Sequence, residues 1–148
     1  MNSKMVGDIG ETKALYEFTK RGIPVSIPFG DNQRYDMIAE FNGKLNRIQC
    51  KVCNEVSNGA IKCNVCSSTM HTNNPAYQQY EDIEYFFFYN QTYDTMALVP
   101  FEVVKDNRRQ ASFRLEPAKN GQTKGVRMWS DYELDKIIVD TPPEDMLE

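Results

Sequence analysis

The stretch that decides the fold is YDMIAEFNGKLNRIQCK, residues 35–51. Apolar and polar residues alternate through much of it, and Asn42-Gly43 near its middle is the strongest short signal for a β-hairpin turn. We therefore expect two antiparallel strands, over residues 35–41 and 45–53, joined at this turn.

Three polar residues of the hairpin form a chemical pattern: Asp36, Gln49 and Lys51. Gln49 and Lys51 are two positions apart, so their side chains point to the same face of the strand, and the hairpin brings Asp36 back beside them. One interpretation is a hydrolytic site. Oxygens of Asp36 and Gln49 would bind Mg²⁺, and Lys51 would orient or deprotonate an attacking water. The alternative is a solvated hairpin face carrying Arg47, Gln49 and Lys51.

Upstream, a helix is predicted over residues 8–21, with Asp8 as its cap and Gly22 as its stop. Four residues fall on one face of this helix: Glu11, Ala14, Leu15 and Phe18. An acid on an apolar face has two interpretations. Glu11 lies either in the first turn, where the helix N-terminus stabilises its charge, or beside Asp36, as a further acid of the site.

The rest of the chain predicts a mixed α/β (α+β) fold, a central sheet flanked by helices. Further strands are expected over residues 60–66, 83–90, 95–99 and 111–115. The aromatic run over residues 85–89 is expected to be a core strand. Short helices are expected over residues 100–104 and 131–138, the latter capped by Ser130. We expect one domain over residues 1–140 and an acidic C-terminal tail over residues 141–148.

Composition limits the possible functions. The chain has 148 residues, 41% of them apolar, and its longest apolar run has five residues, so no membrane span is expected. The N-terminus has no apolar stretch typical of a signal peptide, and a cytoplasmic location is expected. The net charge is −4, but residues 131–148 alone carry −6 and residues 101–127 carry +4. A local basic segment of this kind can bind a polyanion.

The basic segment supplies the candidate DNA-binding residues: Arg108, Arg109, Arg114, Lys119, Lys124 and Arg127. Arginine and lysine contact phosphates, and arginine also reads purine edges. The alternative for this segment is a solvated hairpin.

Four cysteines form two CxxC pairs, Cys50/Cys53 and Cys63/Cys66, which is a spacing typical of zinc sites. However, Cys50 and Cys53 on one strand point to opposite faces and cannot bind one ion together. His71 follows Cys66 at knuckle-like spacing, but Ala76 stands at the fourth ligand position. We expect buried reduced thiols, and structural Zn²⁺ is not expected.

Several stretches together resemble the PD-(D/E)XK nucleases, and more narrowly the homing endonucleases encoded in cyanobacterial group I introns. They are residues 10–14, 22–32, 34–36, 48–51, 80–86 and 127–133. The resemblance implies a restriction-endonuclease-like core and a double-stranded DNA substrate. It also implies phosphodiester hydrolysis with Mg²⁺ or Mn²⁺, and a homo-oligomer, dimer or tetramer, on the long recognition site.

The same resemblance assigns roles to the residues singled out above. Glu11, Asp36 and Gln49 match the metal-binding positions, the backbone carbonyl of Cys50 is a further ligand, and Lys51 matches the lysine that assists the water. Gln49 departs from the family pattern, because a neutral amide replaces the usual acid. Two other functions stay open: a junction or repair nuclease on the same fold, and a non-catalytic zinc-ribbon nucleic-acid-binding module.

Overall fold

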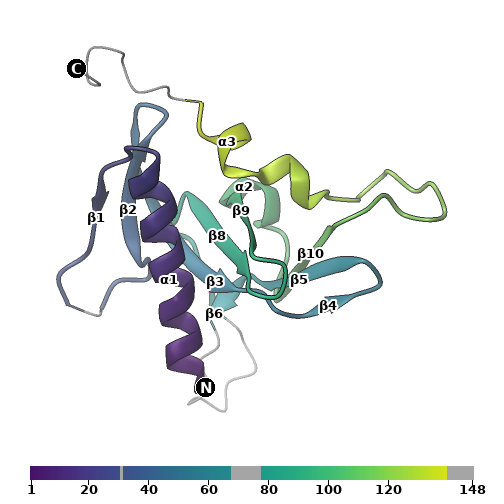
Figure 1. The fold of residues 1–148 in the computed structure, drawn as a ribbon, viewed down its shortest axis with the longest axis horizontal. Coiled ribbons are helices and arrows are strands. Elements are labelled where there is room, and N and C mark those ends of the chain that lie inside the picture. Colours follow the sequence, from purple (N-terminus) through teal and green to yellow (C-terminus); the bar gives the residue numbers. More distant parts are fainter. Residues whose placement is uncertain (31, 68–77, 140–148) are drawn as a thin grey trace.

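A five-stranded mixed sheet forms the centre of the computed structural model, which describes residues 1–30, 32–67 and 78–139 (Figure 1). The strand order is β1-β2-β3-β8-β9. Neighbouring strands pair antiparallel except β3 and β8, which pair parallel. The strands are β1 Val25–Ser26, β2 Met37–Phe41, β3 Lys44–Val52, β8 Tyr85–Asn90 and β9 Thr95–Pro100. The expected mixed fold with a central sheet is therefore confirmed. The predicted acidic tail and His71 lie outside the described residues.

The β2–β3 hairpin is confirmed at the predicted turn. Asn42 and Gly43 have φ values of 55° and 72°, the left-handed pair that a two-residue hairpin turn requires. Asn46 is buried beside the turn, and its amide donates to the carbonyls of Ala39 at 3.2 Å and Phe41 at 3.0 Å. These bonds hold the register of the two strands.

The first helix, α1 Ser3–Lys20, begins five residues before the prediction. The Asn2 side chain caps it by accepting a hydrogen bond from the Met5 amide at 2.9 Å, so Asp8 lies inside the helix and is not the cap. The predicted face is also wrong in part, because Leu15 is 41% exposed and Glu11 is exposed. The residues that α1 buries are Gly10, Ala14, Glu17 and Phe18.

Glu17 is buried on this helix because it is paired. Its carboxylate lies 2.7 Å from the Arg21 guanidinium and 3.5 Å from the Lys13 ammonium. Burial opposes the charge of Glu17, but the hydrogen bond and charge of Arg21 outweigh it and lower the pKa of Glu17. An acid that is paired with two basic residues can occupy a buried position on a helix face. The hydrophobic periodicity of the sequence therefore gave no sign that Glu17 is buried.

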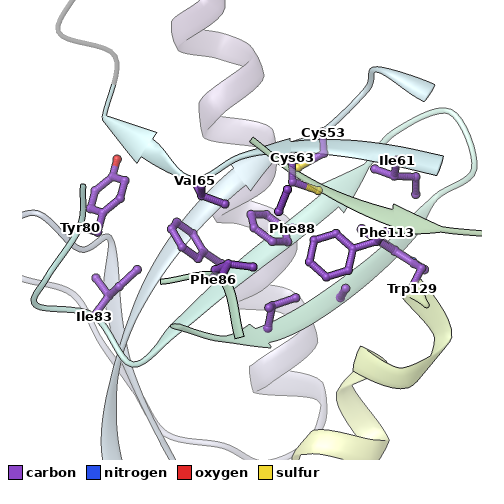
Figure 2. Packing of buried hydrophobic residues seen from close by; sticks show 14 residues of the cluster. Cys53, Ile61, Cys63, Val65, Tyr80, Ile83, Phe86, Phe88, Phe113 and Trp129 are labelled. Carbon is purple, nitrogen blue, oxygen red and sulfur yellow. The ribbon is translucent and has the colours of Figure 1, made fainter. Parts of the chain in front are cut away.

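The central sheet is buried on both faces, with one core on each. The face under α1 holds Phe18, Phe41 and Phe87. The other face is covered by a three-stranded sheet of β10 Gln110–Arg114, β5 Ala60–Asn64 and β4 Val56–Ser57. Figure 2 shows Phe86 and Phe88 packed in this second core. Alternate residues of β8 thus fill opposite cores, which confirms the aromatic run as a core strand.

The C-terminal helix differs from the prediction over residues 131–138. A 3₁₀ turn, η1 Trp129–Tyr132, is followed by the short α3 Leu134–Ile137. Ser130 lies inside the turn and caps nothing, and Glu133 between them is extended, with φ −58° and ψ 143°. The break has a packing reason: Trp129 fills the second core and Leu134 the core under α1, so the chain must cross from one to the other.

Two short elements complete the fold. β6 Cys66–Ser67 pairs antiparallel with β7 Gln78–Gln79, and α2 Phe101–Val104 follows Pro100 as expected. The predicted strand over residues 60–66 is divided, because the Val65 amide leaves the ladder and donates to the Arg109 carbonyl at 2.9 Å. Among the described residues, no helix combines the length and the apolar character that crossing a bilayer requires.

Candidate active site

Asp36 lies where β2 stops pairing with β3. The register ends at Met37 opposite Ile48. Beyond this point β2 no longer pairs with β3, and the Asp36 side chain occupies the edge of β3. Its Oδ2 accepts a hydrogen bond from the Cys50 amide at 2.8 Å, and its own amide donates to the Ile48 carbonyl at 2.8 Å. Because the N–H and C=O of one strand residue point to the same side, the Cys50 carbonyl also faces the open edge that Asp36 occupies.

Glu11 reaches Asp36 from α1 through a close contact between helix and sheet. A Cβ on Gly10 would lie 2.9 Å from the Cγ2 of Val52 on β3, so only glycine allows this approach without a shift. The neighbouring Glu11 side chain lies close enough to the Asp36 carboxyl group for each charge to act on the other. Glu11 therefore lies in the middle of α1, beside Asp36, and the first-turn interpretation is wrong.

The two carboxyl groups share one small volume. Loss of hydration at the helix–sheet contact, together with the charge of Asp36 and the charge of Asp8, raises the pKa of Glu11 to about 7. Two carboxyl groups that share a site typically include one with a raised pKa, because the charge of the first opposes ionisation of the second. Glu11 also remains accessible to solvent, so the pair can exchange its proton for a cation.

Gln49 and Lys51 lie on β3 next to this pair, and both are half-buried rather than fully solvated. The Lys51 Nζ lies 3.4 Å from the Cys66 carbonyl and 5.1 Å from the centre of the Tyr80 ring. Within the described residues, neither side chain bonds to Glu11 or Asp36. Ile48 and Cys50 face α1, so alternation directs Gln49 and Lys51 to the opposite face of the sheet.

The candidate site therefore spans the open edge of β3. Glu11 approaches from the α1 side, Asp36 lies at the edge, and Gln49 and Lys51 project from the other side. A phosphate at this edge could contact the groups on both sides of the sheet. This is more than a hairpin face, because α1 contributes an acid that hairpin geometry alone does not supply.

The cysteines follow the alternation of the strand. Cys50 lies in the core under α1 and Cys53 in the second core, which confirms that they point to opposite faces. Figure 2 shows the sulfur atoms of Cys53 and Cys63 next to each other, and the Cys53 thiol donates to the Lys51 carbonyl at 3.6 Å. Burial raises the pKa of Cys50 and of Cys63, which keeps both thiols protonated and unreactive.

The donors at the open edge suit a hard divalent cation. In the ranges 1–30, 32–67 and 78–139, no group of three His, Cys, Asp or Glu side chains could hold a metal ion. The carboxyl pair of Glu11 and Asp36 offers two acidic ligands, and the Gln49 amide and Cys50 carbonyl are neutral oxygens. Mg²⁺ is usually bound by one or two carboxylates plus waters and substrate phosphates, and a cation would relieve the repulsion between the pair.

The six candidate DNA-binding residues fall into two groups. Arg114 donates to the carbonyls of Glu116 at 2.8 Å and Asn58 at 3.1 Å. Arg127 donates to the carbonyl of Val103 and the side chain of Asn107, both at 3.1 Å. The hydrogen bonds of Arg114 and Arg127 thus fix the backbone at the two ends of the segment between β10 and η1.

The other four are exposed: Arg108, Arg109, Lys119 and Lys124. Lys119 and Lys124 lie on the segment between β10 and η1, which projects from the end of the molecule opposite β1 (Figure 1). Arg108 and Arg109 lie in the turn before β10. The backbone of Arg109 accepts from the amide of Val65 and the thiol of Cys66, so this turn is tied to the chain that contacts Lys51.

Two side chains near Lys51 received no role from sequence patterns. Tyr80 is buried beside it, and the Arg34 guanidinium lies 5.3 Å from the centre of the Tyr80 ring. Arg34 stands two positions before Asp36, in the stretch 34–36 that contributes to the family resemblance, and that position could have associated it with the site.

Comparison with known proteins agrees with this fold. The family model described as PD-(D/E)XK endonuclease matches residues 1–135. Among solved structures, a bacterial homing endonuclease, I-Ssp6803I, is similar, with a TM-score of 0.64 and 18% sequence identity over 83% of each chain. No curated protein matches the chain significantly in sequence.

Proposed function

The chain belongs to the PD-(D/E)XK endonuclease family, and we propose that it is a sequence-specific double-stranded DNA endonuclease of the intron homing type. The observation that carries the proposal is the carboxyl pair of Glu11 and Asp36 at the open edge of β3, with Gln49, the Cys50 carbonyl and Lys51 on the same strand. The homing endonuclease with a similar fold supports the homing type.

Each residue has a part in phosphodiester hydrolysis. Asp36, oriented by the Cys50 amide, and Glu11 would hold a divalent cation with the Gln49 and Cys50 oxygens. When bound, Mg²⁺ or Mn²⁺ would supply Lewis-acid activation of water and stabilise charge on the phosphate oxygens. Lys51 would orient or deprotonate the attacking water and offset negative charge on the phosphate. Because Gln49 is neutral, the site carries one negative charge less than the usual family pattern.

DNA binding would depend on the exposed basic side chains of the 101–127 segment, which are Arg108, Arg109, Lys119 and Lys124. Their phosphate contacts would position the duplex without reading its sequence. A domain of this size covers only part of a long recognition site, so we propose a homo-oligomer, dimer or tetramer, with self-complementary contacts. Light scattering of the purified chain, alone and on DNA, measures this state.

The test is cleavage of DNA by the purified chain. Genomic DNA and intron-flanking DNA of the source organism are incubated with the protein in Mg²⁺, in Mn²⁺ or in EDTA, and the new ends are sequenced. We expect cuts at a defined site that require the divalent cation. Random cutting would overturn sequence specificity, and cutting in EDTA would overturn the metal assignment.

Two variants test the site assignment. Asp36→Asn keeps an oxygen to accept the Cys50 amide but loses the charge, and Lys51→Ala removes the ammonium. Each should reduce cleavage by about 10²–10⁴-fold while DNA binding stays nearly unchanged. The matched control is Lys62→Ala, because Lys62 is also a half-buried strand lysine, and its ammonium donates to the Ser112 hydroxyl at 2.9 Å, away from the candidate site. Near wild-type cleavage by either site variant would overturn the assignment.

The same assay separates the two other functions. Preferential cutting of four-way junctions without a sequence preference would favour a junction or repair nuclease. Stoichiometric bound zinc with DNA binding but no cleavage would favour a non-catalytic zinc module, and metal analysis of the purified protein measures it.

A further inference from the structure

Lys51 is held by the short ribbon of β6 and β7. The Cys66 carbonyl on β6 accepts from its ammonium at 3.4 Å. Tyr80, which directly follows β7, places its ring centre 5.1 Å from the same ammonium. Cys66 pairs with Gln79 in the ribbon register, so the ribbon fixes the two groups that contact Lys51 relative to each other, one on β6 and one directly after β7.

The same Tyr80 ring contacts a second cation. The Arg34 guanidinium carbon lies 5.3 Å from the ring centre, so both cations are within the distance of about 6 Å at which a ring face attracts positive charge. Arg34 belongs to the segment that leads into Asp36. Between them, Tyr35 packs against the second core and anchors the segment.

The ring itself is well fixed. Tyr80 is 6% exposed, and it packs edge-on against Phe86 with ring centres 5.6 Å apart and an interplanar angle of 84°. Figure 2 shows Tyr80 at one end of the second core, beside Phe86. A buried ring locked in this way can hold two cations in place at little entropic cost.

We propose that Tyr80 is a positioning residue that holds the Arg34 guanidinium and the Lys51 ammonium together, and that Arg34 is a second phosphate-binding cation of the nuclease site. This inference rests on the proposed function. Two cations held at one buried ring favour the binding of an anion beside them. The scissile phosphate is the anion that the site would receive.

The chemistry of the two cations differs. A guanidinium offers planar paired donors that fit two phosphate oxygens, whereas an ammonium acts as a compact point charge. Arg34 would therefore donate to non-bridging oxygens and stabilise the charge that develops in the transition state, without forming or breaking a bond. Lys51 would stay with the attacking water. The arrangement also supplies positive charge beside the acids Glu11 and Asp36.

Arg34 is tested by single-turnover cleavage of supercoiled plasmid DNA and of the DNA site that the wild type cuts, at saturating protein. Arg34→Ala should slow cleavage by about 10²-fold, the usual loss for one donor to a developing oxyanion, with DNA affinity changed far less. Arg34→Lys should recover only part of the rate, because the paired donors are lost. Added methylguanidinium should partly restore Arg34→Ala. Lys44→Ala, an exposed cation at the β2–β3 turn, is the control and should cleave normally.

Tyr80 is tested by a pair of variants that separate ring from packing. Tyr80→Phe keeps the ring face and should cleave nearly as the wild type, whereas Tyr80→Leu keeps apolar bulk and should lose about tenfold in rate. The control is Phe101→Leu, because Phe101 also packs on Phe86, with ring centres 6.5 Å apart, and no cation of the described residues lies over it. It should lower the melting temperature as Tyr80→Leu does, without the rate loss at a temperature where both are folded.

Two outcomes are distinguished. Failure of the wild type to cut any DNA with any divalent cation would overturn the proposed function. Wild-type cleavage together with normal rates for Arg34→Ala, or equal losses for Tyr80→Leu and Phe101→Leu, would overturn this inference alone.

Discussion

The carboxyl pair predicts a specific link between pH and metal binding, which Glu11→Gln tests. The pKa of Glu11 is raised to about 7 by loss of hydration and by Asp36, so a cation must displace a proton below that value. At about pH 6, about 90% of Glu11 is protonated and the affinity for Mn²⁺ should be about tenfold below its plateau. At about pH 8, most of this proton is already gone.

Calorimetric titration with Mn²⁺, in buffers of different ionisation enthalpy, measures the protons released. The wild type should release about 0.9 proton per Mn²⁺ at about pH 6 and about 0.1 at about pH 8. Glu11→Gln should bind Mn²⁺ more weakly and release almost none. Glu40→Gln is the control, since Glu40 is an exposed acid of β2. A wild-type affinity that does not change over this pH range would refute the reasoning.

The raised pKa of Glu11 also predicts how the stability of the metal-free protein changes with pH. Because the pKa of Glu11 is higher in the folded chain than its ordinary value of 4.5, the folded state binds more protons between these values. Its stability should therefore fall as the pH rises toward 7. Glu11 is exposed, so water screens most of the repulsion and we expect less than about 1 kcal/mol. Denaturant unfolding at several pH values, with and without Glu11→Gln, measures the difference.

Three further perturbations have defined outcomes. Gln49→Glu should raise the affinity for Mn²⁺ by adding the acid usual in the family, and an unchanged titration would show that Gln49 is not a ligand. Replacing Arg108 and Arg109 with alanine should weaken DNA binding and reduce the log–log salt slope by about 0.9 per lost phosphate contact, with little change in the cleavage rate at saturating DNA. An unchanged slope would exclude these residues from the interface. Glu17→Gln should lower the free energy of unfolding at neutral pH by about 1–3 kcal/mol, because Arg21 loses a charged acceptor. The lowered pKa of Glu17 means that this loss shrinks as the pH falls through it, and a loss independent of pH would contradict the pairing.

Local sequence was sufficient for the parts of the fold set by neighbouring residues. Asn42-Gly43 adopts the left-handed turn that only a few residue types allow, so the hairpin and the return of Asp36 toward β3 followed from it. The strict period of a strand placed Cys50 and Cys53 on opposite faces, and the structure has them in different cores. These features involve residues close in sequence, where steric preference and alternation leave few choices.

Only the tertiary structure decided what surrounds those residues. The Asn2 cap determines where α1 begins, and the close approach of Gly10 to Val52 determines how near Glu11 comes to Asp36. The groups around Lys51 come from β6 and the residue after β7. Periodicity tells which face of a strand a side chain occupies, but the element that covers that face depends on long-range packing. The sheet that joins these segments includes the parallel pair of β3 and β8, whose partners are far apart in the chain and carry no local signal of their pairing.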